Sequence, residues 1–290
     1  MLHTIENDFL KVVVNDAGAE LTHLIQKSSG IDFMWEANPA FWGKRSPVLF
    51  PIVGTLKNDT YKFKNADYKL SRHGFARDRV FEVTHQAEQI LILTLVDDAS
   101  TLLVYPFHFR FSLIYALLED KLSVTYKVEN TGNENMYFSV GGHPAFKLPL
   151  KDHLQYEDYY LAFNQIENTG RWPISADGLI ENAPIELLHS TQQLPLSKAL
   201  FYKDAIVLKH LQSNEIMLKT DKDSAGLLFE FHEFPFFGIW AAKDAPFICL
   251  EPWCGIADAV SSNQLLIEKE GIHSLDTAET FERTWSVTCF

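Results

Sequence analysis

The sequence predicts an all-β protein built as a large antiparallel β-sandwich with few short helices. Apolar and polar residues alternate at period two through most of the 290 residues, which is typical of strands with one buried face. Convincing helical periodicity is scarce, and no Pro/Gly/Ser-rich linker or shift in composition divides the chain. We therefore expect residues 1–290 to form a single domain of two packed sheets.

The clearest element is a hairpin over residues 109–130, FRFSLIYALLEDKLSVTYKVEN. Alternate residues share one face from Phe109 to Leu117, and the alternation resumes from Leu122 to Val128. The segment NTGNEN (130–135) is a loop signal. Only SKALFYK (197–203) and ADAVSSNQLL (257–266) are candidates for short helices. Further strands rich in β-branched and aromatic residues are expected in QILILTLVDD (89–98), DAIVLKHLQSNEIMLKT (204–220), AGLLFEFHEF (225–234) and TFERTWSVTCF (280–290).

Composition excludes several classes of function. The formal net charge of −13 repels phosphate backbones, so nucleic acid is not an expected partner. No apolar run approaches the roughly 20 residues of a membrane helix, and the acidic N-terminus is not a signal peptide. The three cysteines have no C-x-x-C spacing, the histidines are dispersed, and nucleotide-binding glycine motifs are absent. We expect a cytoplasmic protein without metal or cofactor.

Positive charge gathers in residues 44–80, where nine basic residues stand against three acidic ones. In RHGFARDR (72–79), His73 and Arg77 suggest an anion site or a hydroxyl-binding cluster. Arg72 and Arg79 fit structural surface positions better. The segment FWGKRSPVLFPIVG (41–54) adds Arg45, which by itself is a weak signal.

Two separate motifs offer acid–base groups. In SVGGHPAF (139–146), two glycines and a proline present His143 just after a strand. In APFICLEPWCGIA (245–257), Glu251 is the only charged residue of an apolar run. A structural histidine and a structural salt bridge are the plainer interpretations. A positioned imidazole and a carboxylate with a raised pKa are, however, typical of general acids and bases.

Two further residues are weaker candidates. Asp204 precedes an apolar strand, where an aspartate is usually a turn or cap residue. Trp240 ends the segment HEFPFFGIW (232–240) and is either a core residue or a platform for a sugar ring.

Taken together, GGHPAF, RHGFARD and ICLEPWCGIAD resemble motifs of the aldose 1-epimerase (galactose mutarotase-like) family, and the match is best to its LacX-like branch. The resemblance extends from NDFLKVVVNDAGAEL through RSPVLFPIVG to EPWCGIAD. It implies a galactose mutarotase-like β-supersandwich that interconverts sugar α- and β-anomers without a cofactor. A homodimer is left open.

The resemblance also implies roles for single residues. His143 matches the family's catalytic acid, Glu251 its catalytic base, and Asp204 a carboxylate that holds sugar hydroxyls. Arg45 and His73, together with Arg77, lie in segments that line the site in relatives. The Asn-His-x-Tyr-Phe-like motif of galactose-specific members is absent, which leaves the sugar open. The GHPAF and HGFAR motifs also resemble hexose-6-phosphate mutarotases, so the substrate is expected to be a hexose or a hexose phosphate.

The expected reaction needs one base and one acid. Glu251 removes the proton of the C1 hydroxyl while His143 protonates the ring oxygen; rotation about C1–C2 and reclosure then invert the anomer. We expect His143 to start protonated, with Asp204 favouring that state. A non-catalytic carbohydrate-binding protein is the main alternative. A glycosidase using Asp204 and Glu251 ranks below it, because a glycosidase acid is usually a carboxyl group.

Overall fold

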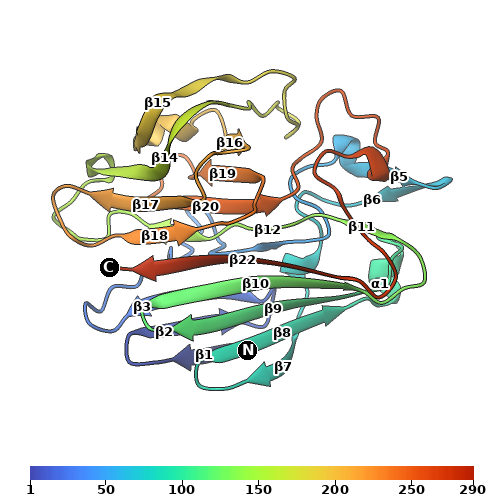
Figure 1. Ribbon diagram of the computed structural model, residues 1–290, viewed down its shortest axis with the longest axis horizontal. Coiled ribbons are helices and arrows are strands. Elements are labelled where there is room, and N and C mark those ends of the chain that lie inside the picture. Colours follow the sequence, from blue (N-terminus) through green and yellow to red (C-terminus); the bar gives the residue numbers. More distant parts are fainter.

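A nine-stranded antiparallel sheet dominates the computed structural model, which describes residues 1–290 (Figure 1). In Figure 1 this sheet runs from β15 at the top of the molecule to β7 at the bottom. In spatial order its strands are β15 (Ile185–Pro195), β14 (Tyr159–Arg171), β17 (Glu215–Thr220), β18 (Leu227–Glu230), β22 (Thr280–Cys289), β10 (Lys121–Asn130), β9 (Phe109–Leu118), β8 (Ile90–Val96) and β7 (Glu82–Gln86).

A six-stranded sheet carries several of the candidate site residues. Its strands are β16 (Ile206–Lys209), β19 (Phe236–Trp240), β20 (Phe247–Cys254), β12 (Val140–Gly142) and β4 (Val48–Leu49), with β13 (Ala145–Lys147) also paired to β20. The remaining strands form a three-stranded sheet and two two-stranded sheets: β1 (Leu2–Glu6), β2 (Leu10–Asn15) and β3 (Glu20–Gln26); β5 (Thr60–Phe63) and β6 (Ala66–Lys69); β11 (Met136–Phe138) and β21 (His273–Leu275). Every pairing between named strands is antiparallel. The predicted fold class is therefore confirmed.

The predicted hairpin is confirmed in detail as β9 and β10. Leu122 pairs with Leu117, and Val128 pairs with Phe111. The residues predicted to share the inner face are all buried, whereas the alternate positions other than Ser112 are at least partly exposed. The two-residue period of apolar side chains thus sets both the pairing and the buried face.

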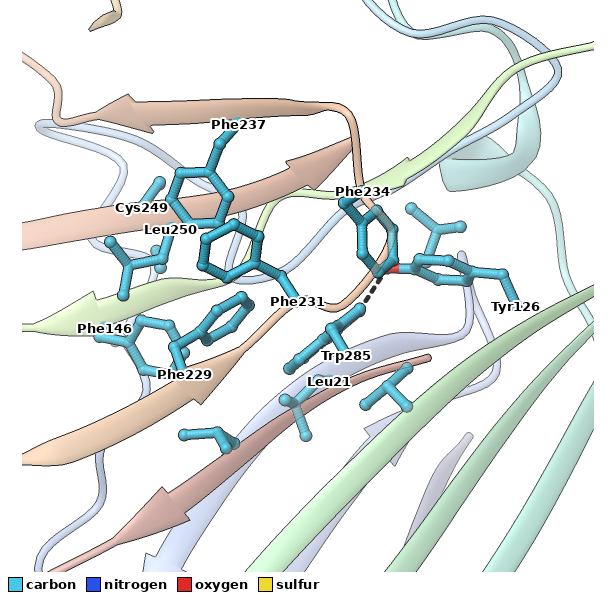
Figure 2. Packing of buried hydrophobic residues seen from close by; sticks show 14 of the residues in the cluster. Leu21, Tyr126, Phe146, Phe229, Phe231, Phe234, Phe237, Cys249, Leu250 and Trp285 are labelled. Atoms are coloured by element: carbon cyan, nitrogen blue, oxygen red, sulfur yellow. Dashed lines mark hydrogen bonds between the residues drawn. The ribbon is translucent and has the colours of Figure 1, made fainter. Parts of the chain in front are cut away.

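The main core joins both ends of the chain, since its 72 buried residues extend from Ile5 to Cys289. Figure 2 shows its aromatic centre, where the indole Nε1 of Trp285 donates a hydrogen bond to the hydroxyl of Tyr126 at 2.7 Å. A Cβ atom placed on Gly142 would lie 2.4 Å from that hydroxyl. Glycine at this position therefore lets β12 approach the core closely.

Helical structure is sparse, as expected, but one predicted helix is wrong. Residues 198–201 form a 3₁₀ turn inside the predicted segment 197–203. The segment 257–266 forms turns instead, because Asp258 O and the N–H of Val260 pair with the backbone of Ile180. The short elements are α1 (Ala99–Leu102) and the 3₁₀ turns η1 (Lys57–Asp59), η2 (Ala76–Asp78), η3 (Tyr156–Asp158), η4 (Lys198–Phe201) and η5 (Leu266–Glu268). None of the helices has the length and apolar character that crossing a bilayer requires.

Candidate active site

A cavity of about 780 Å³ brings together side chains from seven separate segments of the chain. Its size falls in the range of small-molecule sites. The residues that line it are Trp42, Lys44, Pro47, Arg72, His73, Arg77, His143, Ile174, Ser175, Ala176, Tyr202, Lys203, Asp204, Ala205, Trp240, Glu251 and Trp253. All the site residues predicted from the sequence are in this set except Arg45.

His143 follows directly after β12, which pairs with β20 on one side and β4 on the other. Its two preceding glycines are required by close packing: a Cβ atom on Gly141 would lie 2.8 Å from Cδ1 of Trp253, and Gly142 meets Tyr126 as described above. Pro144 then fixes the departing chain. The close packing of the two glycines and the fixed backbone of Pro144 hold the imidazole in the cavity wall, where it is only 9% exposed.

Glu251 lies inside β20, every residue of which is buried. It is 1% exposed, and its Oε2 atom lies 3.2 Å from Nε2 of His143. Its cross-strand partner on β19 is Gly238. The isolated carboxylate of the apolar run is thus in direct contact with the imidazole of the GGHPAF motif.

Burial favours the uncharged form of both members of this pair. It lowers the pKa of His143 to about 3, and the positive charges of Arg72 and Arg77 act in the same direction. Burial also raises the pKa of Glu251 well above its ordinary value, with Arg72 opposing and Asp204 reinforcing that rise. Burial thus opposes the protonated state expected for His143 and favours a neutral pair that shares one proton.

Asp204 lies in the loop between η4 and β16 and lines the cavity. Its backbone has φ = 98°, a left-handed conformation that is strained for a residue other than glycine. One carboxylate oxygen accepts a hydrogen bond from the N–H of Ala205 at 2.7 Å. No other protein group donates to this carboxylate, which leaves it capacity to accept hydroxyl hydrogen bonds from a ligand.

His73 is buried beside the pair of His143 and Glu251, with its ring centroid 5.9 Å from that of His143. Burial and the neighbouring charge of Arg72 lower its pKa well below the ordinary value, so the ring is neutral. Its Nδ1 accepts the N–H of Gly54 at 3.1 Å, which places the ring proton on Nε2. Arg72 also directs its Nε–H toward Nε2 of this ring at 3.3 Å, which is longer than the Gly54 contact, and a neutral imidazole accepts at only one nitrogen.

Arg77 and Arg72 give the cavity a cationic side. Arg77 donates through Nη2 to the carbonyl of Arg72 at 2.8 Å, and its Nε lies 3.7 Å from the carboxylate of Asp78. Arg72, which the sequence analysis treated as a surface residue, lines the cavity together with Lys44 and Lys203. Four cationic side chains therefore face the same space as two carboxylates.

Two tryptophans flank the imidazole. Trp240 lies edge-on to His143 with ring centroids 5.5 Å apart, and Trp42 tilts over the same ring at 4.9 Å. Both line the cavity, and both are only partly buried. Trp240 is thus available as the platform expected from the sequence, and Trp42 is a second one.

The position of Arg45 corrects its expected role. Its guanidinium donates to the carbonyls of Thr22 at 2.6 Å and Glu36 at 3.1 Å, and it contacts His23. Arg45, Thr22 and His23 line a separate surface hollow of about 250 Å³. Arg45 instead anchors the chain near the site, because its carbonyl accepts the N–H of Ala145.

Several lining residues carried no clear signal in the sequence. Trp253 is two residues from Glu251, so strand alternation alone would have placed it on the same face. Arg72 is adjacent to His73 in the chain. Lys203 and Tyr202 come from the loop before Asp204, where nothing in the local sequence shows which way the side chains turn.

One cluster of three buried residues has possible ligand atoms close enough together to hold a metal ion. Single atoms of His143, Cys249 and Glu251 lie within 4.8 Å of one another. Burial raises the pKa of the Cys249 thiol well above its ordinary value and keeps it protonated, whereas metals bind the thiolate. The partly exposed set of Glu215, Glu230 and His232 meets the same distance limit, but Glu230 already contacts Lys121 at 2.5 Å.

A large antiparallel β-sandwich with an imidazole–carboxylate pair in a tryptophan-flanked cavity belongs to the class of galactose mutarotase-like folds. A solved galactose mutarotase related enzyme from Lactobacillus acidophilus is 37% identical, with a TM-score of 0.95 over 100% of this chain and 97% of that one. A galactose mutarotase-like protein from Lactobacillus casei ATCC 334 is 28% identical, with a TM-score of 0.93 and full coverage of both chains.

Sequence comparison gives the family directly. The family model described as aldose 1-epimerase matches residues 1–264. Protein LacX, chromosomal, from Lactococcus lactis subsp. lactis is 29% identical over 293 residues and covers 98% of each chain. This chain belongs to the aldose 1-epimerase family, and the predicted resemblance to its LacX-like branch is confirmed. Family membership supports an isomerase-type enzyme that acts on sugars.

Proposed function

We propose that the protein is a cofactor-independent aldose 1-epimerase that interconverts the α- and β-anomers of a hexose or a hexose phosphate. The observation that carries the proposal is the 3.2 Å contact between His143 Nε2 and Glu251 Oε2 in the wall of the cavity. We further propose that residues 1–290 work as one domain, because a single buried cluster includes both Ile5 and Cys289.

Glu251 is proposed as the base and His143 as the acid. In the free protein the pair holds one proton, so the reactive arrangement of carboxylate and imidazolium requires only a transfer across the 3.2 Å contact. This transfer changes no net charge, and a buried site tolerates it better than the uptake of a proton from solvent. Arg72 supports the ionised carboxylate, since its charge lowers the pKa of Glu251.

Ring opening then follows with protons balanced. Glu251 takes the proton of the C1 hydroxyl, the C1–O5 bond breaks, and His143 delivers its proton to O5. The pair has returned to its neutral state with the proton on Glu251. After rotation about C1–C2, His143 takes the O5 proton back and Glu251 protonates the carbonyl oxygen as the ring closes, which completes the exchange of anomers.

Substrate binding is proposed to use the other lining residues. Asp204 accepts hydrogen bonds from sugar hydroxyls, Nε2–H of His73 donates one, and Trp240 packs against the apolar face of the sugar ring. Arg77 is the candidate contact for an anionic substituent. The cationic side of the cavity supports a phosphorylated sugar as a substrate, and the neutral hexose is the alternative that experiment must separate.

The proposal is tested by two-dimensional exchange NMR on glucose, galactose and glucose 6-phosphate. We expect at least one sugar to exchange its anomers faster with the protein than in buffer. A sugar that binds saturably without faster exchange would instead identify a non-catalytic carbohydrate-binding protein. If no sugar binds or exchanges, the proposal is wrong.

A further inference from the structure

One buried hydrogen-bond donor in the site has no partner. Trp253 is 6% exposed and lines the cavity, but its indole Nε1 makes no hydrogen bond. Other buried indoles are satisfied: Trp285 donates to the Tyr126 hydroxyl at 2.7 Å, and Trp35 donates to the Trp42 carbonyl at 2.9 Å. A buried donor without a partner is unfavourable, and it therefore needs an explanation in terms of another state of the site.

The indole lies beside the catalytic carboxylate. Trp253 follows Glu251 by two residues on β20, so both side chains leave the same face of the strand. A Cβ atom on Gly238 would lie 2.5 Å from Cζ2 of Trp253 and 3.2 Å from Cβ of Glu251. On the other side, Gly141 approaches Cδ1 of the indole. Nε1 lies on the edge of the indole between Cδ1 and Cζ2. Gly141 and Gly238, on the two neighbouring strands, therefore leave space for this edge.

We infer that Trp253 is a positioning residue for Glu251, because its Nε1–H becomes a hydrogen-bond donor to the carboxylate when Glu251 is ionised. This inference rests on the proposed function. The indole N–H of Trp253, which has no partner in the free protein, then gains an acceptor when Glu251 is ionised. Trp253 already belongs to the groups that lower the pKa of Glu251, although burial has the larger and opposite effect.

An uncharged donor suits this position better than a cation. Among the groups that face Glu251, His143 must become positively charged, and Arg72 already lowers the pKa of both residues. Asp204 raises the pKa of Glu251, and the protonated thiol of Cys249 adds no charge. A further cation would oppose protonation of His143, whereas an indole N–H stabilises the carboxylate without that effect.

The test compares wild type with Trp253→Phe, which keeps an aromatic ring and removes the N–H. Infrared spectra across a pH series follow the C=O band of the protonated carboxyl group, assigned with Glu251→Gln. We expect the pH midpoint of this band to rise by about one unit, the size expected for losing one hydrogen bond to a charged group. Where turnover is measurable, the basic limb of the rate profile moves upward by the same amount.

Two controls separate the hydrogen bond from packing. Replacing Trp253 with 3-benzothienylalanine keeps the shape of the indole without the N–H, and it serves if Trp253→Phe does not fold. Trp285→Phe removes a buried indole whose N–H is satisfied, and we expect it to leave the carboxyl midpoint unchanged. An unchanged midpoint in both Trp253 variants would overturn the inference. A shifted midpoint without turnover of any sugar would leave it standing while refuting the proposed function.

Discussion

Two buried acid–base pairs in this protein differ in how completely their polar atoms are satisfied. Lys269 Nζ lies 2.9 Å from Asp258 Oδ1 and also donates to the carbonyl of Ile256, while Asp258 Oδ2 accepts the N–H of Lys57. His143 and Glu251 contact each other at 3.2 Å, but Nδ1 of His143 has no partner, and both residues line the large cavity.

The difference separates a structural pair from the pair that we propose to be reactive. Asp258 and Lys269 have partners within the fold, so their interaction energy goes into stability. The pair of His143 and Glu251 has polar atoms without hydrogen-bond partners beside a cavity. A ligand in the cavity could therefore supply the missing partners. Removal of one member of the first pair should destabilise the protein, and removal of one member of the second should abolish the proposed chemistry.

The largest expected effect comes from Glu251→Gln. The amide keeps the shape of the side chain but cannot accept a proton, so the rate of anomer exchange should fall about 10²–10⁴-fold. Urea unfolding should show no loss of stability, because an amide remains neutral in the buried site. The exposed Glu88→Gln is the matched control. A Glu251→Gln protein with the wild-type rate would remove the distinction between the two pairs.

Lys269→Met should have the opposite profile. Removal of one partner leaves the charge of Asp258 buried, which destabilises proteins by about 3–5 kcal/mol. We expect this loss in urea unfolding, with the exchange rate per folded molecule close to that of wild type. Full stability combined with a strong loss of rate would contradict the structural assignment of this pair.

The pH dependence of the rate follows from the opposite shifts of His143 and Glu251. Above the lowered pKa of His143, about 3, and below the raised pKa of Glu251, the pair holds one proton. We therefore expect a plateau in kcat/KM that falls toward pH 3 as a second proton binds, and at high pH as the last proton leaves. Circular dichroism separates this decline from acid unfolding. An acid limb at the ordinary pKa of histidine, near 6.5, would contradict the buried neutral imidazole.

The smallest expected effects distinguish two arginines. Arg77→Ala removes a cation from the cavity and should raise KM about tenfold or more for a phosphorylated sugar, since hydrogen bonds to charged groups are worth about 1.5–3 kcal/mol. Arg45→Ala should leave KM unchanged and instead lower stability, because its guanidinium binds backbone carbonyls. Steady-state kinetics and thermal unfolding of both variants check this, and a raised KM for Arg45→Ala alone would reverse the assignment.

Strand alternation made most of the fold predictable. The hairpin of β9 and β10 has its predicted turn and inner face because each register slip would expose its apolar side chains. The segment 257–266 could not be predicted in the same way. Its backbone pairs with Ile180, far away in the sequence, and this pairing outweighs a weak local preference for helix.

The candidate site was predictable where short motifs restrict the backbone. The glycines before His143 and the apolar run around Glu251 indicated both members of the pair. Long flexible side chains were not predictable, since the direction of a guanidinium depends on distant acceptors. Arg45 reaches the carbonyl of Thr22, whereas Arg72 turns into the cavity.

A double-mutant cycle on anomer exchange tests the central claim most directly, namely that His143 and Glu251 pass one proton as a unit. Exchange NMR gives the rates of wild type, His143→Gln, Glu251→Gln and the double variant for one sugar. Residues that act as a unit lose their function together, so we predict that the double variant is within a few-fold of either single variant. Losses that multiply would contradict a shared proton, as would a wild-type rate no higher than that of buffer.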